Sequence, residues 1–244
     1  MAEFKLPTET VDLPSKGLIY PKDNPLSSGK VEMKYMTAKE EDILTNQNYI
    51  RNGTVIDKLL KSLIVSNINI DDLIIGDKNA LLVSARILGY GSDYTFTSFG
   101  KEYTVDLSKL DSKIIDESLF TGKNEFEYTL PHSGTKITFQ IMTEGLDKQI
   151  EGELKGLSKI NKDNIPEMST RMKYIILSVE GENDKKYIRD FVDKGLLARD
   201  AKALRDHIVK IQPDVKLVFD RETYDGDIEE EEIPINTNFF FPNV

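Results

Sequence analysis

The sequence contains no cysteine among its 244 residues and only two histidines. Without cysteine the chain forms neither a disulfide nor a thiolate-bound metal site, which is typical of proteins from a reducing compartment. It also lacks any apolar run of the about 18 or more residues needed to span a bilayer. The initial segment MAEFKLPTET has no cationic region followed by an apolar one. We therefore expect no secretion signal and no membrane partner.

Basic residues are scarce relative to acidic ones. The chain has 32 Lys and Arg against 42 Asp and Glu, a formal net charge of -10, and it contains no basic run. Sequence-independent binding to nucleic acid needs clustered Lys and Arg, so we expect no nucleic-acid partner. Hydrophobic residues make up 39% and charged residues 30%, a composition typical of soluble globular proteins that bury a substantial core. The expected partners are proteins.

The organising feature of the sequence is a stretch that occurs twice. VDLPSKGLIY (Val11–Tyr20) precedes KVEMKYMTAKEEDIL, and TLPHSG (Thr129–Gly134) precedes KITFQIMTEGLDKQI. In each copy Leu-Pro-x-x-Gly is followed by a strand of period-2 alternation, then Met-Thr, then a helix with an acidic first turn. Thr37 and Thr143 are placed to cap these helices. The repetition predicts an α+β fold with two pseudo-repeated halves, each with short strands, a helical cluster and a β-hairpin.

We divide the chain into three segments. Residues 1–29 are rich in Pro, Ser, Gly and Lys and predict an extended N-terminal arm with one strand near Phe4–Leu13. Such an arm either wraps its own core or reaches a neighbour, and the sequence favours neither. Residues 30–110 form the first α+β half. Residues 111–244 form the second, which includes a C-terminal hairpin and an aromatic tail.

Periodicity, caps and turn residues predict the elements of each half. The first half is expected to contain a strand over 30–37, helices that begin at Thr37, Thr54 and Asp77, and a hairpin over 92–107. A helical connector over 107–120, broken near Asp111, is expected to lead into the second half. The second is expected to contain strands near 126–130 and 137–141, a helix over 143–160, an apolar helix from after Pro166 to Gly181, a helix over 184–198, a helix capped by Asp200, and a hairpin over 216–235 that turns at Tyr224-Asp225-Gly226.

Few residues favour catalysis. His132 lies in a Pro-His-Ser-Gly turn, and His207 lies on a predicted helix beside Asp206. A hydrolase that uses Ser133 and His132 is one hypothesis, but no Gly-x-Ser-x-Gly elbow accompanies them. Histidines this far apart in sequence are more often structural. We assign no catalytic, cofactor-binding or metal residue and expect no cofactor.

Clusters of acidic residues allow two interpretations each. The group Asp71, Asp72 and Asp77 could bind a hard cation in a metal-site enzyme, but its spacing does not match a twelve-residue calcium loop. The run Glu229–Glu232 is either solvated charge or a docking surface for a basic partner.

The three aromatic residues Phe239–Phe241 lie near the end of the sequence. Leaving them exposed costs about 25 cal/mol per Å² of apolar area. They must therefore pack on their own domain or on another subunit.

Taken together, LPSKGLIYP with MTAKEEDIL, GDKNALLVSARILGYG, TLPHSG, and a terminal IPI to FFFP resemble the baseplate hub subunit family of T-even-like contractile-tailed phages over nearly the full chain. The resemblance implies a non-enzymatic structural or assembly subunit of the tail baseplate hub. It implies an oligomeric assembly with other hub and tail proteins, located in the virion and, during assembly, in the host cytoplasm. An alternative within the same resemblance is an assembly chaperone that is absent from the mature particle.

Many members of that family carry paired cysteines in two hairpins that resemble a split zinc ribbon. The corresponding residues here are about 95–101 and 219–226, which contain no cysteine, so we expect no zinc. If the hairpins still associate, aromatic packing must replace the metal. The aromatic residues placed to do so are Tyr94, Phe96, Phe99, Tyr103, Phe219 and Tyr224.

We expect partner contacts at the arm and at the tail. Lys16 and Tyr20 would reach a partner, while Pro14 and Gly17 fix the turn that presents them. The complete set of candidate contact residues is Leu13, Pro14, Lys16, Gly17, Tyr20, Phe239, Phe240 and Phe241.

Overall fold

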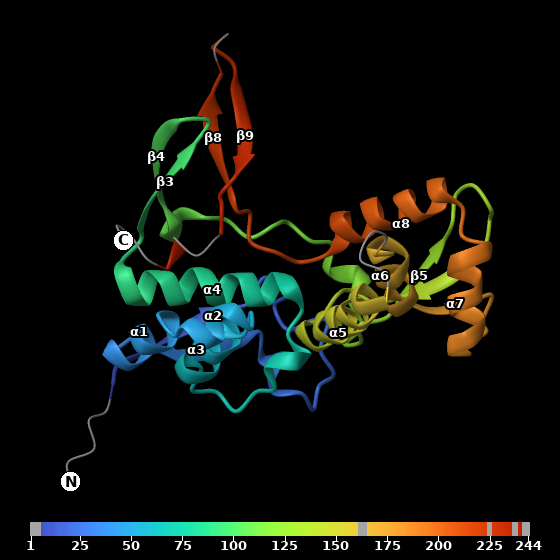
Figure 1. Cartoon of the computed structure of the whole chain (residues 1–244), viewed down its shortest axis with the longest axis horizontal. Coiled ribbons are helices and arrows are strands. Elements are labelled where there is room, and N and C mark those ends of the chain that lie inside the picture. Colours follow the sequence, from blue (N-terminus) through green and yellow to red (C-terminus); the bar gives the residue numbers. More distant parts are fainter. Residues whose placement is uncertain (1–5, 161–164, 224–225, 236–238, 241–244) are drawn as a thin grey trace.

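The computed structural model describes residues 6–160, 165–223, 226–235 and 239–240. Over these residues the chain has a mixed α+β fold in which helices accompany several small antiparallel sheets (Figure 1). The predicted fold class is confirmed. Buried residues from both halves form one continuous hydrophobic core.

The first half starts with a two-stranded sheet in which β1 (Thr8–Asp12) pairs with β2 (Lys30–Lys34). Its remaining elements are α1 (Ala38–Leu44), α2 (Gln47–Arg51), α3 (Val55–Leu63), α4 (Ile75–Tyr90), β3 (Asp93–Ser98) and β4 (Lys101–Asp106). Helix α4 lies over α1–α3, and the β3–β4 hairpin rises from its end (Figure 1). The predicted capping box of Thr37 and Glu40 is present at α1.

Residues 6–29 of the predicted N-terminal arm pack on their own chain, whereas residues 1–5, which include Phe4 of the predicted strand, lie outside the described residues. Besides the β1–β2 pairing, the side chains of Leu13, Ile19 and Leu26 are buried in the core. Of the two interpretations that the sequence allowed, the arm therefore wraps its own core. A boundary after residue 29 would separate β1 from the strand with which it pairs.

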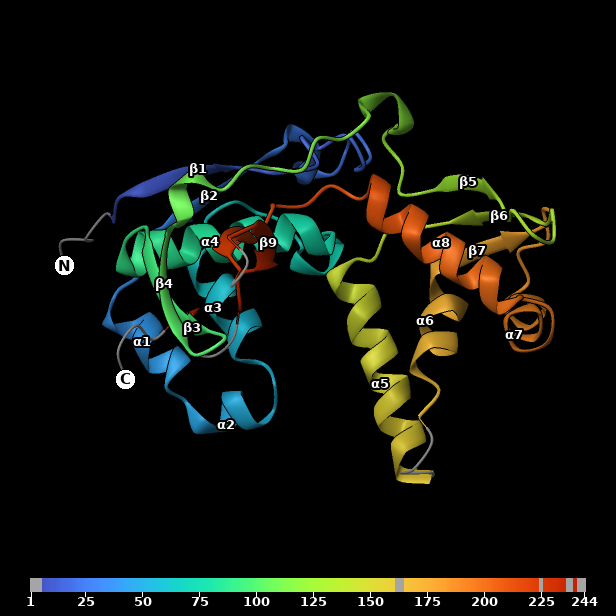
Figure 2. The same cartoon turned by 90° about the horizontal axis from the view of Figure 1, so that it is seen from above.

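The second half contains a three-stranded sheet of order β5-β6-β7. Its elements are β5 (Phe126–Thr129), β6 (Lys136–Phe139), α5 (Glu144–Ile160), α6 (Glu167–Ile175), β7 (Ile176–Val179), α7 (Lys185–Lys194), α8 (Ala198–Ile211), β8 (Val218–Glu222) and β9 (Ile228–Glu232). Helices α5 and α6 project from it side by side (Figure 2).

Two expectations for this half were wrong. The helix expected to run to Gly181 ends at Ile175, because Ile176–Val179 leaves the helix to pair with β6 and buries two β-branched side chains. Asp200 does not cap α8. Leu197 is the N-cap residue, and Asp200 is the third residue of the helix.

In the first half, the short helix α2, capped by the Asn46 side chain, was not predicted.

The two halves repeat one order of elements. In each, two antiparallel strands flank a Leu-Pro turn, helices follow, and a later segment pairs with the second strand. That segment is β7 in the second half and a single bridge between Met33 and Ile64 in the first. Each half then ends in a helix, α4 or α8, that leads to a hairpin.

The halves join through backbone contacts beside α4. Ile75 donates its N–H to the Met142 carbonyl at 3.1 Å, and Glu144 donates to the Leu73 carbonyl at 2.8 Å. At Gly76 a Cβ atom would lie 1.9 Å from the Pro213 carbonyl oxygen, so only glycine fits this approach. The relative placement of the halves is therefore fixed by main-chain packing.

The two hairpins pack against each other through aromatic rings, side by side in Figure 1. Phe219 of β8 packs against two rings of the first hairpin, with centroids 4.9 Å from Phe96 and 4.8 Å from Tyr103. Tyr94 meets Phe239 edge-on at 5.0 Å. The expected aromatic packing between the hairpins is present for these residues. Tyr224, with the predicted turn at Tyr224-Asp225, lies outside the described residues. Phe99 makes no ring–ring contact with the second hairpin, because its side chain is exposed at the tip, where the guanidinium of Arg221 from β8 lies over its ring.

Candidate functional site

The first Leu-Pro turn, Leu13–Gly17, has a rigid backbone. Lys16 donates its N–H to the Leu13 carbonyl at 2.8 Å, and both Lys16 and Gly17 have positive φ, 53° and 78°. A Cβ atom on Gly17 would lie 2.4 Å from the Ser27 carbonyl oxygen. The glycine is therefore required both by its φ and by the close approach of the following loop.

A buried carboxylate fastens this turn to α4. Asp77 accepts hydrogen bonds from the Ser15 N–H at 2.9 Å, the Ser15 hydroxyl at 2.6 Å and the Tyr20 hydroxyl at 2.6 Å. The Tyr20 hydroxyl in turn accepts the Ile74 N–H at 3.1 Å. Burial raises the pKa of the Asp77 carboxyl. Burial and the Asp77 charge raise the pKa of the Tyr20 hydroxyl, so this hydroxyl remains a donor.

The second Leu-Pro turn is also held by a carboxylate from a helix, but through fewer hydrogen bonds. Asp200 accepts the N–H groups of His132 at 2.8 Å and Ser133 at 3.0 Å. Burial opposes ionisation of this carboxyl, but the backbone hydrogen bonds lower its pKa. The turn residues that follow Leu130 are exposed, because this turn continues directly into β6 without a covering loop.

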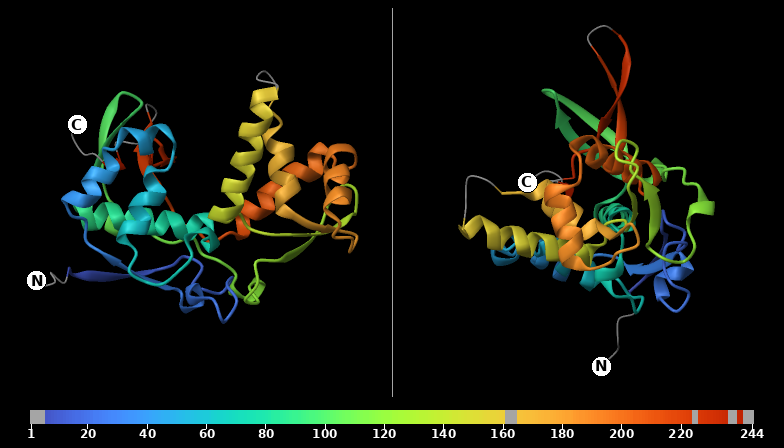
Figure 3. Two further views of the ribbon diagram at one scale, coloured as in Figure 1. Left: turned by 60° about the horizontal axis from the view of Figure 1, so that its bottom comes forward. Right: turned by 90° about the vertical axis from the view of Figure 1, so that its right-hand side faces the viewer.

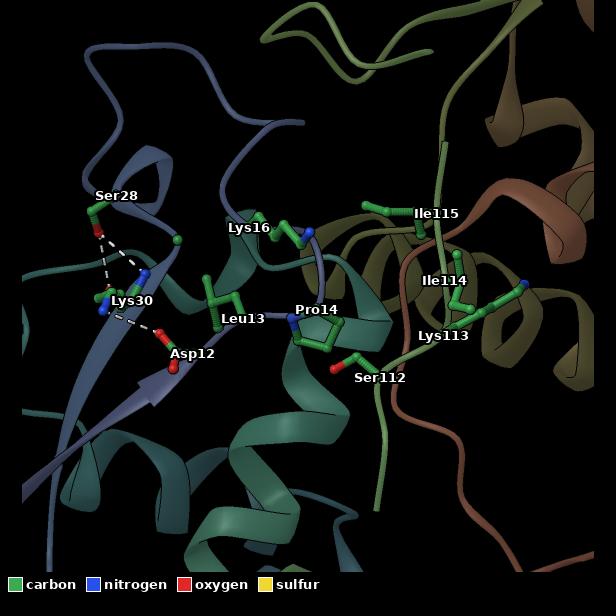
Figure 4. A pocket seen from close by; sticks show the side chains of 11 residues that line it. Asp12, Leu13, Pro14, Lys16, Ser28, Lys30, Ser112, Lys113, Ile114 and Ile115 are labelled. Atoms are coloured by element: carbon green, nitrogen blue, oxygen red, sulfur yellow. Dashed lines mark hydrogen bonds and ion pairs between the residues drawn. The ribbon is translucent and has the colours of Figure 1, made fainter. Parts of the chain in front are cut away.

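An open groove of about 600 Å³ lies between the first turn and a linker that comes from a distant part of the sequence. On one side are Asp12–Pro14, Lys16 and 28–30, and on the other is the segment 112–115 (Figure 4). We call this feature the turn groove. Ile114, on the linker side, has 90% of its surface exposed.

The linker side of the turn groove is held in place by the second half. Lys113 donates its N–H to the Asp214 carbonyl at 2.8 Å, and Lys216 donates to the Asp111 carbonyl at 2.8 Å. The Lys113 ammonium also donates to the Val209 carbonyl. The Lys16 ammonium pairs with Glu117 across the end of the groove. Both walls are therefore ordered, and the groove is preformed.

The predicted contact residues fall into three groups. Leu13, Pro14 and Lys16 line the turn groove, but Leu13 and Pro14 are themselves buried and only Lys16 is exposed. Gly17 and Tyr20 are buried. Because the Tyr20 side chain is 5% exposed and points at Asp77, it does not reach out to a partner as expected.

The tail residues Phe239 and Phe240 are 0% and 2% exposed, so they follow the self-packing interpretation. Phe241 lies outside the described residues. Ile114 and Ile115 were not predicted as contact residues, although two adjacent isoleucines in the polar stretch DSKIIDES were a usable signal.

The hydrolase hypothesis placed Ser133 and His132 beside an acid. In the structure both oxygens of Asp200 accept backbone N–H groups, and the Ser133 hydroxyl accepts the Thr135 N–H at 3.4 Å. The other histidine, His207, stacks on Tyr128 at 4.4 Å. Among the hydrogen bonds of the described residues, none joins the His132 ring to the Ser133 hydroxyl.

The candidate cation ligands are dispersed. Asp77 serves the first turn, Asp71 accepts from the Lys148 ammonium at 2.8 Å, and Asp72 accepts from the Asn24 amide at 2.9 Å. Over residues 6–160, 165–223, 226–235 and 239–240, no group of three or more His, Asp or Glu side chains is arranged to hold a metal.

The acidic run of β9 is divided between the two faces of its hairpin. On one face Arg221 binds Glu229 at 2.8 Å and Glu231 at 3.0 Å. Glu230 lies opposite Asp220 on the other face, where both are exposed.

Comparison with known proteins gave no relatives: no family model, no curated protein and no solved structure matched the chain. Within the part of the chain that the structure describes, none of the helices combines the length and the apolar character needed to cross a bilayer.

Proposed function

We propose that the chain is a structural or assembly subunit of the baseplate hub of a contractile phage tail, and that it acts through protein–protein contacts. The order of motifs along the sequence supports the hub assignment, through the family resemblance that these motifs carry. The turn groove supports the proposed action through protein–protein contacts, and the proposal rests mainly on this groove.

The groove has the properties of a protein-binding surface. A preformed surface loses little conformational entropy on binding. Its lining combines the aliphatic side chains of Ile114 and Ile115 with the ammonium groups of Lys16 and Lys30. An isoleucine that is 90% exposed beside a concave surface is unfavourable in an isolated subunit and is covered when a partner binds.

The experiment is a complementation test in a phage that carries this gene, with mass spectrometry of purified particles. We expect the wild-type chain in the tail fraction. Ile114→Asp should fold with an unchanged urea midpoint and reduce the incorporated chain by about tenfold, equivalent to about 1.4 kcal/mol of contact energy. Ile228→Asp is the matched control, because Ile228 is 72% exposed but lies on the hairpin away from the groove.

Incorporation of Ile114→Asp at the wild-type level would contradict the assignment of the groove. A wild-type chain that is required for tail formation but absent from particles would instead identify an assembly chaperone.

A further inference from the structure

Strand β1 has a free edge. Leu13 donates its N–H to the Gly29 carbonyl at 2.8 Å, and Tyr35 donates to the Pro7 carbonyl at 3.3 Å. In an antiparallel pair, hydrogen-bonded and non-hydrogen-bonded residue pairs alternate. With the observed register, the odd-numbered residues of β1 bond to β2, and the N–H and C=O groups of Thr8, Thr10 and Asp12 point away from it.

No other described segment occupies these outward groups. On its far side β2 is already in contact with the chain after α3, since Val65 donates its N–H to the Glu32 carbonyl at 2.8 Å. On the β1 side, no backbone hydrogen bond between described residues reaches Thr8, Thr10 or Asp12. Their side chains are exposed, and β1 runs along the outer margin of the molecule next to the N-terminus (Figure 3, left).

The edge has only part of the protection that normally prevents pairing with another chain. Edge strands are protected by short length, charged side chains, proline, bulges or covering segments, and β1 has the first two, with five residues that include Glu9 and Asp12. The sequence of β1, TETVD, contains neither lysine nor proline, and its register with β2 has no break. An edge of this kind is a template for an added strand.

The free edge leads directly into the turn groove. The last residue of β1, Asp12, and the next two, Leu13 and Pro14, line one wall of that groove. A strand added to β1 and extended past Asp12 therefore enters the groove beside Ile114. Edge and groove form one continuous surface.

Charge favours a basic occupant over a second copy of this chain. β1 carries Glu9 and Asp12 and no cation, and the whole chain has a net charge of -10. Asp12 already pairs with Lys30 at 3.3 Å. Lys16, Lys30 and Lys113 line the groove, so the basic side chains of an occupant belong opposite β1 and not in the groove. A second copy would bring the same acidic strand, and a five-residue strand pair buries far less than the about 1,200 Å² of a stable interface. Lysine or arginine opposite these acids gives favourable cross-strand pairs.

We propose that β1 binds an extended, Lys- or Arg-bearing segment of a partner protein as an added β-strand, whose end fills the turn groove. This inference rests on the proposed function, because it names the kind of partner that the subunit contacts.

The test measures the fluorescence anisotropy of a fluorescein-labelled peptide, Lys-Thr-Val-Thr-Val-Thr-Lys, as the full chain is titrated into it. Thr10→Pro removes one outward N–H and leaves the bonds to β2 intact, so we expect binding about tenfold weaker or more. Thr10→Ala keeps the N–H and should bind within about twofold of wild type. Replacing both peptide lysines with glutamate should weaken binding by at least about tenfold.

A second measurement keeps the proposal testable if Thr10→Pro does not fold. The same peptide, N-methylated on alternate residues of one edge and then of the other, is titrated against the wild-type chain. Only one of the two methylated peptides should lose affinity, because a strand uses one edge to pair. Equal binding of all peptides, undiminished binding to Thr10→Pro, or no binding would overturn the proposal. A Thr10-dependent dimer that does not bind the peptide would also overturn it, in favour of a second copy.

The outcomes separate this inference from the function on which it rests. Edge-dependent peptide binding by a chain that is absent from tails and not required for them would refute the hub role alone. Normal incorporation of Thr10→Pro, together with no peptide binding, would refute the added strand and leave the hub role standing.

Discussion

Asp77 and Asp200 are each the third residue of a helix, and each accepts hydrogen bonds from the backbone of a Leu-Pro turn in its own half of the chain. In each half, one carboxylate thus connects the Leu-Pro turn between two strands to the helix that leads into the hairpin. The two Leu-Pro turns differ in how far other segments of the chain cover them. The first turn lies under a loop and beside the linker that forms the turn groove, whereas the second is open to solvent.

The glycines of the two turns provide a matched test of that difference. Gly17 and Gly134 both have positive φ, 78° and 73°, but only Gly17 has backbone atoms where a Cβ would be. We expect Gly134→Ala to lower the free energy of unfolding by about 1 kcal/mol, from the backbone strain alone. Gly17→Ala should cost at least about 2 kcal/mol more, because the loop at Ser27 must also move. Urea denaturation measures both. Equal losses of unfolding free energy for the two variants would show that the loop at Ser27 does not pack closely against Gly17.

Removal of the Asp77 carboxylate should be strongly destabilising. Asp77→Ala leaves the hydroxyls of Ser15 and Tyr20 buried without their acceptor, and each unsatisfied group costs about 1–3 kcal/mol. The control is Asp23→Ala, an exposed position, where we expect a change within about 0.5 kcal/mol. The same urea titrations apply, and a loss below 1 kcal/mol for Asp77→Ala would contradict the role of this network.

The hairpin contact should depend on Phe219. Phe219→Ala removes a buried ring that packs against Phe96 and Tyr103, and we expect a loss of about 3–5 kcal/mol. Phe99→Ala is the control, since this ring is 73% exposed and contacts Arg221 only at the tip. Its expected cost is about 0.5–1 kcal/mol. If both substitutions cost the same, the aromatic cluster does not hold the hairpins together.

Local patterns predicted much of this fold, and long-range contacts account for what they missed. The capping box at Thr37 and both hairpins follow from residues adjacent in sequence. Ile176–Val179 is a short apolar run that is compatible with helix or strand, and only its pairing with β6 decides between them. Such a pairing is not encoded in the segment itself.

The candidate site was half predicted for the same reason. The turn at Leu13–Gly17 was identified because proline and glycine mark it locally. Its opposite wall, 112–115, is almost one hundred residues away and is placed by hydrogen bonds to Asp214 and neighbouring residues. The burial of Tyr20 likewise depends on Asp77, a residue of α4 that was predicted as a helix start and as a candidate cation ligand but not as a partner of Tyr20.

Glu40 should make stability depend on pH in the acid range. Burial opposes its ionisation, but hydrogen bonds from Ser62, Thr37 and Lys34 hold its pKa at about 2, below the 4.5 of a free glutamate. A lowered pKa in the folded state adds stability that is complete above pH 4.5 and is lost as the pH falls toward about 2. The wild type should therefore exceed Glu40→Gln in stability at neutral pH, and the difference should shrink in that window. Unfolding free energies from pH 2 to 7 test this, and a pH-independent difference would refute it.

The most direct test of the central claim is the position of this chain in a reconstructed phage tail. The account predicts that a neighbouring subunit covers the turn groove and that one of its extended segments lies against β1 at Thr8–Asp12. A reconstruction in which the chain is present but both Ile114 and the β1 edge face solvent would contradict it.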